Sequence, residues 1–325
     1  MMPATAQIRK AGAIALFAGI LLAMRVGIAR SGMAASMDGQ LCPALLSFAL
    51  LLAPLWFFGF GLGDWLARRI RSSWSRVAFA ALLGAPYLVF AFPAGTLRWS
   101  VVIVVFLLPV MLSATLESSA STRKLAWQDG VVLGALAAVY LLRLVTPAWP
   151  YAGLAVLSKL YVADLALYLY IVVRKLDGAG YSLVPSRHTF LIGLREWVYF
   201  APLGIGFGTV LRFIHFHTRT LSATSALIGV LTTFLLVAVP EEMFFRGILQ
   251  NLLETRVGQN IALVLAAVLF GLSHFNKGAS FNWRYVILAT IAGIFYGRAW
   301  RARRQVLASS ITHTAVDVIW SLWFR

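Results

Sequence analysis

The chain has 325 residues, of which 61% are hydrophobic and only 12% are charged, about half the charged share of an average soluble domain. This composition excludes an ordinary water-soluble globular protein. The 28 Lys and Arg residues outnumber the 11 Asp and Glu residues, which gives a formal net charge of +17. Nucleic-acid-binding proteins can be equally basic, but they carry the basic patch on a soluble scaffold, so we expect no nucleic acid partner.

Long apolar runs follow one another along the chain and predict membrane-spanning helices. A helix rises ~1.5 Å per residue and the hydrocarbon core of a bilayer is ~30 Å thick, so about 20 apolar residues span it. In chain order the runs cover residues 11–24, 39–63, 77–97, 99–116, 131–145, 157–173, 197–214, 220–240, 257–276, 285–297 and 306–324. The sequence therefore predicts an all-α fold, a polytopic transmembrane helical bundle of about ten or eleven spans.

The basic residues are clustered between these runs, and their positions predict the orientation of the chain. Loops on the cytoplasmic side of a membrane carry an excess of Lys and Arg. With alternating spans, the clusters at residues 9–10, 68–76, 123–124, 174–195 and 298–304 all fall on one side. We therefore expect an integral, multi-pass protein of a bacterial-type cell (inner) membrane, with a cytoplasmic N-terminus and the lipid bilayer as its surroundings.

The distribution of titratable residues divides the chain into two parts. Residues 1–190 hold no cluster of titratable groups within the apolar runs, and the stretch 176–195 is the most loop-like of the chain. Clusters of Gly and Pro between periodic segments are typical of such boundaries. We predict an N-terminal transmembrane bundle over residues 1–190, to which the sequence assigns no role, and a C-terminal core over residues 191–325.

Glu241 and Glu242 form an acidic pair at the end of the run 220–240. A carboxylate at membrane depth costs roughly 2.5–3.5 kcal/mol on insertion scales, so a partner must compensate it. Glu242 and Arg246 stand four residues apart on one helical face and can pair, whereas Glu241 points about 100° away. An unpaired carboxylate of this kind suits a general base. In the alternative interpretation, the span ends at Pro240 and both glutamates begin a solvated helix.

A histidine follows at the far end of the next apolar run, at His274. If the preceding span ended at Glu241, simple alternation would separate the glutamates and His274 by the thickness of the membrane. A helix that continues to about Leu253 would instead bring the glutamates to mid-depth. A shared site therefore requires the longer helix.

His313 and Asp317 lie four residues apart inside the last run. A single intramembrane histidine is usually a packing residue that hydrogen-bonds a neighbouring helix. Here three neighbouring spans each offer titratable side chains, in a chain with only 5 His in total. This combination favours one shared functional site.

Three motifs now stand in order: Glu-Glu-x-x-x-Arg at 241–246, Phe-x-x-x-His at 270–274 and His-x-x-x-Asp at 313–317. Together they resemble the signature of the CAAX protease and bacteriocin-processing (CPBP) family of intramembrane glutamic endopeptidases. The resemblance covers roughly residues 195–325. It implies that residues 191–325 form a CPBP-like catalytic core that hydrolyses a peptide bond of a membrane-anchored peptide or protein, with no cofactor.

The resemblance also implies roles for the residues at matching positions. Glu241 and His274 would activate the attacking water, and His313 would stabilise the oxyanion. Glu242 and Arg246 would support this catalytic group. No serine or cysteine nucleophile is required, and the Gly-x-Ser-x-Gly elbow that presents a nucleophilic serine is absent from the sequence.

The third motif departs from the family, which usually has Asn where this chain has Asp317. An amide always carries N–H donors, whereas a carboxyl group donates only when it is protonated. Two interpretations follow. Asp317 can stay neutral in an apolar site and donate a hydrogen bond, or it can accept one and orient His313.

Two other functional classes remain open at this point. Glu241, His274 and His313 could instead bind a divalent metal such as zinc, which would make the reaction a metal-dependent hydrolysis. The His-Glu-x-x-His spacing of many zinc proteases is absent. A transporter or a noncatalytic scaffold could also hold acids and histidines at this depth as a proton-relay cluster.

Overall fold

The computed structural model describes residues 4–30, 39–119, 124–151, 153–217, 222–275 and 281–324. Arg123, in one of the predicted basic clusters, lies outside these residues. The chain divides into two compact units. Unit 1 comprises Met1–Thr122 with Ala126–Lys175, and unit 2 comprises Arg123–Leu125 with Leu176–Arg325.

The described regular elements of unit 1 are all helices. Its elements are α1 (Ala4–Arg30), α3 (Leu41–Phe58), α4 (Leu62–Arg69), α5 (Ser73–Phe79), η1 (Ala80–Gly84), α6 (Ala85–Ala91), α7 (Trp99–Glu117), α8 (Trp127–Leu141), η2 (Thr146–Ala148), α9 (Ala155–Leu167) and η3 (Tyr168–Val173). Helix α9 and its π-helical continuation η3 form the buried centre of the unit, with α3 packed against α9. Asp129 and Arg174 form a buried ion pair with a 3.0 Å contact.

Unit 2 carries all the motifs of the sequence analysis. Its elements are α10 (Arg187–Val210), α11 (Ala223–Thr233), η4 (Phe234–Ala238), α12 (Val239–Glu242), η5 (Met243–Gln250), α13 (Asn251–Val257), α14 (Gln259–Leu272), α15 (Trp283–Arg303) and α16 (Val306–Trp323). Helix α15 packs against α14, α10 and α16. It therefore forms the centre of this unit.

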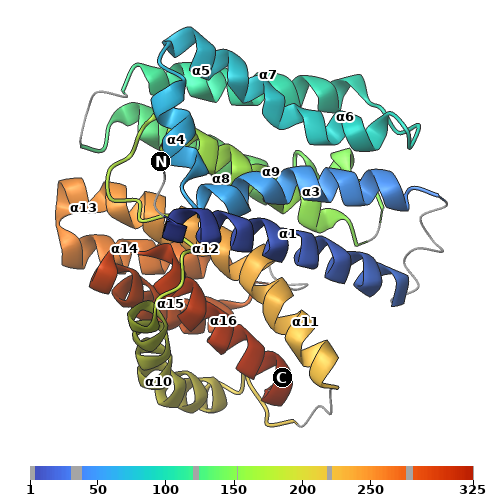
Figure 1. The fold of residues 1–325 in the computed structure, drawn as a ribbon. Coiled ribbons are helices and arrows are strands. Elements are labelled where there is room, and N and C mark those ends of the chain that lie inside the picture. The colour runs from blue at the N-terminus through green and yellow to red at the C-terminus, as the bar shows by residue number, and fades with distance from the viewer. Residues whose placement is uncertain are drawn as a thin grey trace. The chain divides into compact units, whose positions relative to one another are not determined.

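The elements from α11 to α13 form one continuous helix of 35 residues, Ala223–Val257 (Figure 1). The Ser222 hydroxyl caps its start by accepting a hydrogen bond from the backbone N–H of Ser225. Gly258, with φ at +78°, ends it in a conformation that only glycine adopts readily. The continuation of the helix beyond Glu241, which a shared site requires, is thus confirmed.

Two π-helical stretches, η4 and η5, interrupt the α-helical geometry of this long helix on either side of the glutamate pair. Such π-turns are rare and occur frequently at functional sites. The acidic pair therefore lies at a local distortion in the middle of a membrane-depth helix, and not at its solvated start.

Glycines bring α14 and α15 into close contact at Gly293 and Gly297. A Cβ atom at Gly293 would lie 3.1 Å from the backbone of Ala267, and one at Gly297 would lie 2.3 Å from the Leu263 side chain. Small residues four apart allow the backbones of membrane helices to approach in this way. The approach places α15 directly against the helix that follows the acidic pair.

The helical polytopic bundle predicted from the sequence is confirmed. Seven helices among the described residues are long and apolar enough to cross a membrane. Two further apolar helices, Trp127–Leu141 and Gln259–Leu272, are shorter. The last two predicted runs lie on α15 and α16, so each predicted run includes a described helix. The run 39–63 also crosses the turn between α3 and α4, and the run 77–97 continues beyond the end of α6.

Candidate functional site

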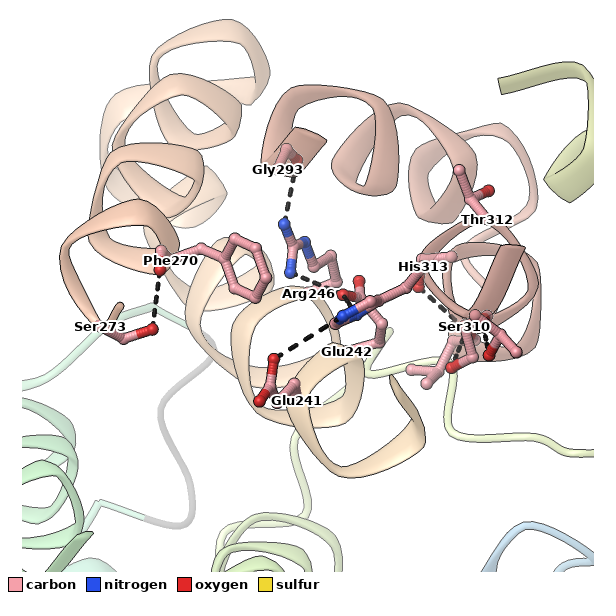
Figure 2. A network of polar contacts seen from close by, with 12 residues as sticks. Glu241, Glu242, Arg246, Phe270, Ser273, Gly293, Ser310, Thr312 and His313 are labelled. Atoms are coloured by element: carbon pink, nitrogen blue, oxygen red, sulfur yellow. Dashed lines mark hydrogen bonds and ion pairs between the residues drawn. The ribbon is translucent and has the colours of Figure 1, made fainter. Parts of the chain in front are cut away.

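Glu242 and Arg246 form an ion pair inside unit 2. Arg246 Nη1 donates to Glu242 Oε1 at 2.9 Å, and both side chains have no exposed surface. Arg246 Nη2 donates to the carbonyl of Gly293 at 3.0 Å, and the guanidinium lies 4.5 Å above the centre of the Phe270 ring. Figure 2 shows Arg246 between Glu242 and Gly293. The pairing predicted from the spacing is present, and the solvated alternative is excluded because both groups are buried.

His313 binds the same carboxylate from helix α16. Its Nδ1 lies 2.8 Å from Glu242 Oε1. A carboxylate paired with arginine accepts hydrogen bonds and does not donate them, so Nδ1 carries the proton of this contact. The orientation of the imidazole is fixed further by Tyr296, whose ring stacks on it at 4.6 Å with an interplanar angle of 14°. Nε2 is therefore the atom of His313 that can take part in chemistry.

Two further carboxylates face that nitrogen. Asp317 Oδ2 lies 3.4 Å from His313 Nε2, one turn along the same helix. Glu241 Oε2 lies 3.9 Å from Nε2, and this buried oxygen has no hydrogen bond to a described residue. Figure 2 shows Glu241 directed toward His313. Glu241 Oε2 is therefore available for another partner.

His274 lies at the end of α14 and is buried. Its Nδ1 lies 2.9 Å from the Phe270 carbonyl and 3.1 Å from Ser273 Oγ. The carbonyl oxygen can only accept, so Nδ1–H donates to it, and Nε2 holds the lone pair of the neutral ring. In a neutral imidazole this atom is the base.

One cavity joins the two histidines. It encloses about 710 Å³ including its open mouth and is lined by residues of α10, α14, α15 and α16, among them His274, His313 and Asp317. The Phe270 ring contacts both imidazoles, with ring centres 4.8 Å from His274 and 5.7 Å from His313. The rest of the lining is mostly apolar and aromatic. It includes Trp197, Phe200, Leu288, Ile319 and Trp320.

The six residues predicted from sequence fall into two sets within this region. Glu242, Arg246, Glu241 and Asp317 gather around His313. His274 shares the cavity and the Phe270 ring with His313.

Sequence reasoning missed two parts of this site. Tyr296 stacks on His313, and the carbonyl of Gly293 accepts from Arg246. Both belong to the run 285–297, where an aromatic residue and a glycine look like ordinary membrane sequence. The spacing of Gly293 and Gly297 is the signal that could have marked this face of α15 for close contact.

A divalent metal would need several of these groups to converge on one point. Among the described residues, no group of three or more His, Cys, Asp or Glu side chains is arranged to hold a metal ion. The Nδ1 atoms of His313 and His274 face Glu242 and a backbone carbonyl, respectively, so Nε2 is the remaining nitrogen of each ring. We derive no step through a metal, and the zinc alternative requires a direct test with a chelator.

Comparison with known proteins finds a family model that matches the segment around this site. Residues 223–319 match the family model described as type II CAAX prenyl endopeptidase Rce1-like. All six predicted site residues lie within the matched segment. Searches of the curated proteins and of the solved structures find no match to the chain. The match confirms the family resemblance predicted from the three motifs and, with the apolar helices, supports a membrane protease, which is a hydrolase and an integral membrane protein.

Proposed function

We propose that this protein is an intramembrane glutamic endopeptidase that hydrolyses a peptide bond of a membrane-anchored peptide or protein. The observation that carries the proposal is the arrangement around His313. One imidazole bridges a buried Glu242–Arg246 pair on one side and Glu241 and Asp317 on the other, at the edge of a cavity that also holds His274.

In the proposed reaction, Glu241 and His274 take a proton from a water molecule between them. The water oxygen attacks the carbonyl carbon of the substrate, a C–O bond forms, and the carbonyl oxygen becomes an oxyanion. His313 in its doubly protonated form donates Nε2–H to that oxyanion, a type of contact worth roughly 10²–10³ in rate. The C–N bond then breaks, and the proton held by the base passes to the leaving amine.

Glu242 and Arg246 act in this scheme by positioning His313. Glu242 Oε1 accepts from both Arg246 and His313, so the ion pair fixes which imidazole nitrogen points into the site. Asp317 lies close enough to Nε2 to accept its proton in a hydrogen bond between catalytic cycles. We assign it the orienting role, because an ionised carboxylate beside Nε2 can accept and an imidazolium can donate.

The apolar lining of the cavity supports a substrate that is itself membrane-anchored. The apolar side chains of such a substrate can pack against this lining, as is typical of binding cavities. The sequence-based orientation places the basic cluster 298–304 on the cytoplasmic side, and we propose the same for the N-terminus and a bacterial-type inner membrane for the protein. Reporter fusions at either terminus would test this orientation.

The test of the proposed function uses purified protein in lipid vesicles with a set of membrane-anchored fluorogenic peptides. Cleavage is expected for the native chain and is expected to be lost in Glu241→Gln and His274→Asn. Both variants should retain the native thermal midpoint, since each substitution is close to isosteric. Cleavage that survives Glu241→Gln would reject the glutamic mechanism.

The metal alternative is tested in the same assay. We expect cleavage to persist in the presence of a strong chelator and metal analysis to show less than one equivalent of zinc. Loss of activity in chelator, with recovery on adding zinc, would replace the glutamic mechanism with a metal-dependent one. To search for a natural substrate, membrane proteomes of cells carrying the native chain and Glu241→Ala can be compared for an accumulating uncleaved protein.

A further inference from the structure

A row of polar side chains continues from the site along the long helix. Glu242, Arg246, Gln250 and Glu254 recur every four residues and so follow one face of this helix. We call these four residues the polar file. Glu254 follows Glu242 by 12 residues, which corresponds to ~18 Å along the axis of an α-helix. Polar side chains in that number are costly at membrane depth and are typical of function.

Burial decreases along the polar file from the site outward. Glu242, Arg246 and Gln250 have no exposed surface, and the Glu254 side chain is 6% exposed. Glu254 forms an ion pair with Arg304, whose side chain is 39% exposed. The file therefore connects His313, through Glu242, to a polar surface of unit 2 at the basic end of α15.

The hydrogen bonds along the polar file have a gap between Arg246 and Gln250. Gln250 Nε2 donates to Glu254 Oε1 at 3.4 Å, and Arg246 Nη1 donates to Glu242. Between these contacts, Arg246 Nε and Gln250 Oε1 are buried and have no hydrogen bond to a described residue. One is a donor and the other an acceptor. A water molecule that accepts from Arg246 and donates to Gln250 would satisfy both, as buried waters commonly do.

The opposite wall of the polar file is the glycine face of α15. A Cβ atom at Gly293 would lie 3.1 Å from Arg246 Nη2, and one at Gly297 would lie 2.6 Å from Gln250 Oε1. Any larger residue at either position would press on the polar groups. The two glycines thus leave room for the side chains of Arg246 and Gln250, and they also allow α14 to pack closely against α15.

Hydrolysis consumes one water molecule for each peptide bond that is broken. The cavity beside His313 has a mostly apolar lining, and a bound substrate would fill it. Water must then reach the site from another side, and the polar file approaches His313 from the Glu242 side. Resting on the proposed function, we propose that the polar file is a water path that supplies the hydrolytic water from the surface near Arg304.

The presence of water in the file can be tested without any protease assay. The chain has a single cysteine, Cys42, and Cys42→Ser gives a background for introduced thiols. Thiolates form and react in water. We expect hydroxyethyl methanethiosulfonate to modify Gln250→Cys at least ~10-fold faster than Ile248→Cys, which is equally buried at 1% exposure and lies off the file.

A second pair of cysteine variants keeps the test valid if one variant of the first pair fails to fold. Glu254→Cys, one turn nearer the surface, is compared with Leu252→Cys at a fully buried position. Faster modification at both file positions supports the water path. Equal or slower modification at the file position of either folded pair overturns it, whether or not the protein cleaves peptides.

The supply of water to the reaction is tested by the rate of cleavage. We expect Gln250→Leu to lower kcat about 10-fold, or ~1.4 kcal/mol in activation free energy, with KM and the thermal midpoint unchanged. Gln250→Asn should restore kcat because it keeps a polar group in the file. Gln259→Leu, at an exposed glutamine of the same unit, is the matched control. An unchanged kcat in Gln250→Leu overturns water supply by this path while leaving the protease function intact.

Discussion

The ion pair between Arg246 and Glu242 offers a quantitative test of how the site is built. In Arg246→Met, the Glu242 carboxylate would remain fully buried without its cation, and the Gly293 carbonyl would lose its donor. Breaking a buried pair by removing one partner costs about 3–5 kcal/mol. At roughly 2–4 °C per kcal/mol for a large domain, the thermal midpoint should fall by roughly 6–20 °C.

The double variant Glu242→Leu with Arg246→Met separates stability from function. Replacing both partners of a buried ion pair with apolar residues is often neutral for stability, so the double variant should recover most of the lost midpoint. It should still be inactive, because His313 Nδ1 would have lost the oxygen that orients it. Thermal unfolding in detergent and peptide cleavage in vesicles measure the two effects on the same preparations.

Two results would refute this reasoning. The free energy of unfolding of Arg246→Met could lie within about 1 kcal/mol of that of the native chain. This result would show that solvent reaches the ion pair, as it reaches a surface pair, although both groups are buried in the structure. The double variant could also be less stable than the single one. In that case the carboxylate would stabilise the fold through His313 rather than through Arg246.

Three further predictions concern single residues of unit 2. Tyr296→Phe keeps the ring that stacks on His313 and should retain kcat, whereas Tyr296→Leu should lose about 2–10-fold, as expected from an aromatic pair worth 0.5–1.5 kcal/mol; equal activities would reject the stacking role. Asp317→Asn should keep cleavage activity within about 10-fold of the native chain, because its amide can accept and donate hydrogen bonds. Asp317→Leu can do neither and should lose about 100-fold in activity. A full loss of activity in Asp317→Asn would show that the charge is essential. Gly258→Ala meets no atom within 4 Å, so backbone strain alone should lower the free energy of unfolding by about 1–3 kcal/mol; an unchanged thermal midpoint would contradict it.

The fold was largely predictable from the sequence because the apolar runs are the helices. Each predicted run includes a described helix, and the requirement that Glu241 and His274 share a depth led to the longer helix that the structure contains. The positions where the helix becomes π-helical were not predictable. Residues 234–238 and 243–250 have no Pro or Gly pattern that distinguishes them from an ordinary α-helix except Gly247.

The acids and histidines of the candidate site were predictable from the sequence, as was the one pairing within a helix, but the pairings between helices were not. Spacing along one helix predicted the contact between Glu242 and Arg246, because residues four apart share a face. Contacts between helices depend on packing, and nothing in the motifs fixes which carboxylate meets which imidazole. The contact of His313 with Glu242 and the stacking of Tyr296 therefore became visible only in the structure.

The π-helical stretches on either side of the glutamates have a consequence for any comparison of related chains. A π-turn holds one more residue than an α-turn, so it accommodates an extra residue without the ~100° rotation that an added residue causes in a regular α-helix. A relative with one residue fewer in one of these stretches, and a regular α-turn in its place, would therefore keep the flanking side chains on the same faces of the helix. Within 234–250, the face that each side chain occupies defines the site more closely than the number of residues between the motifs.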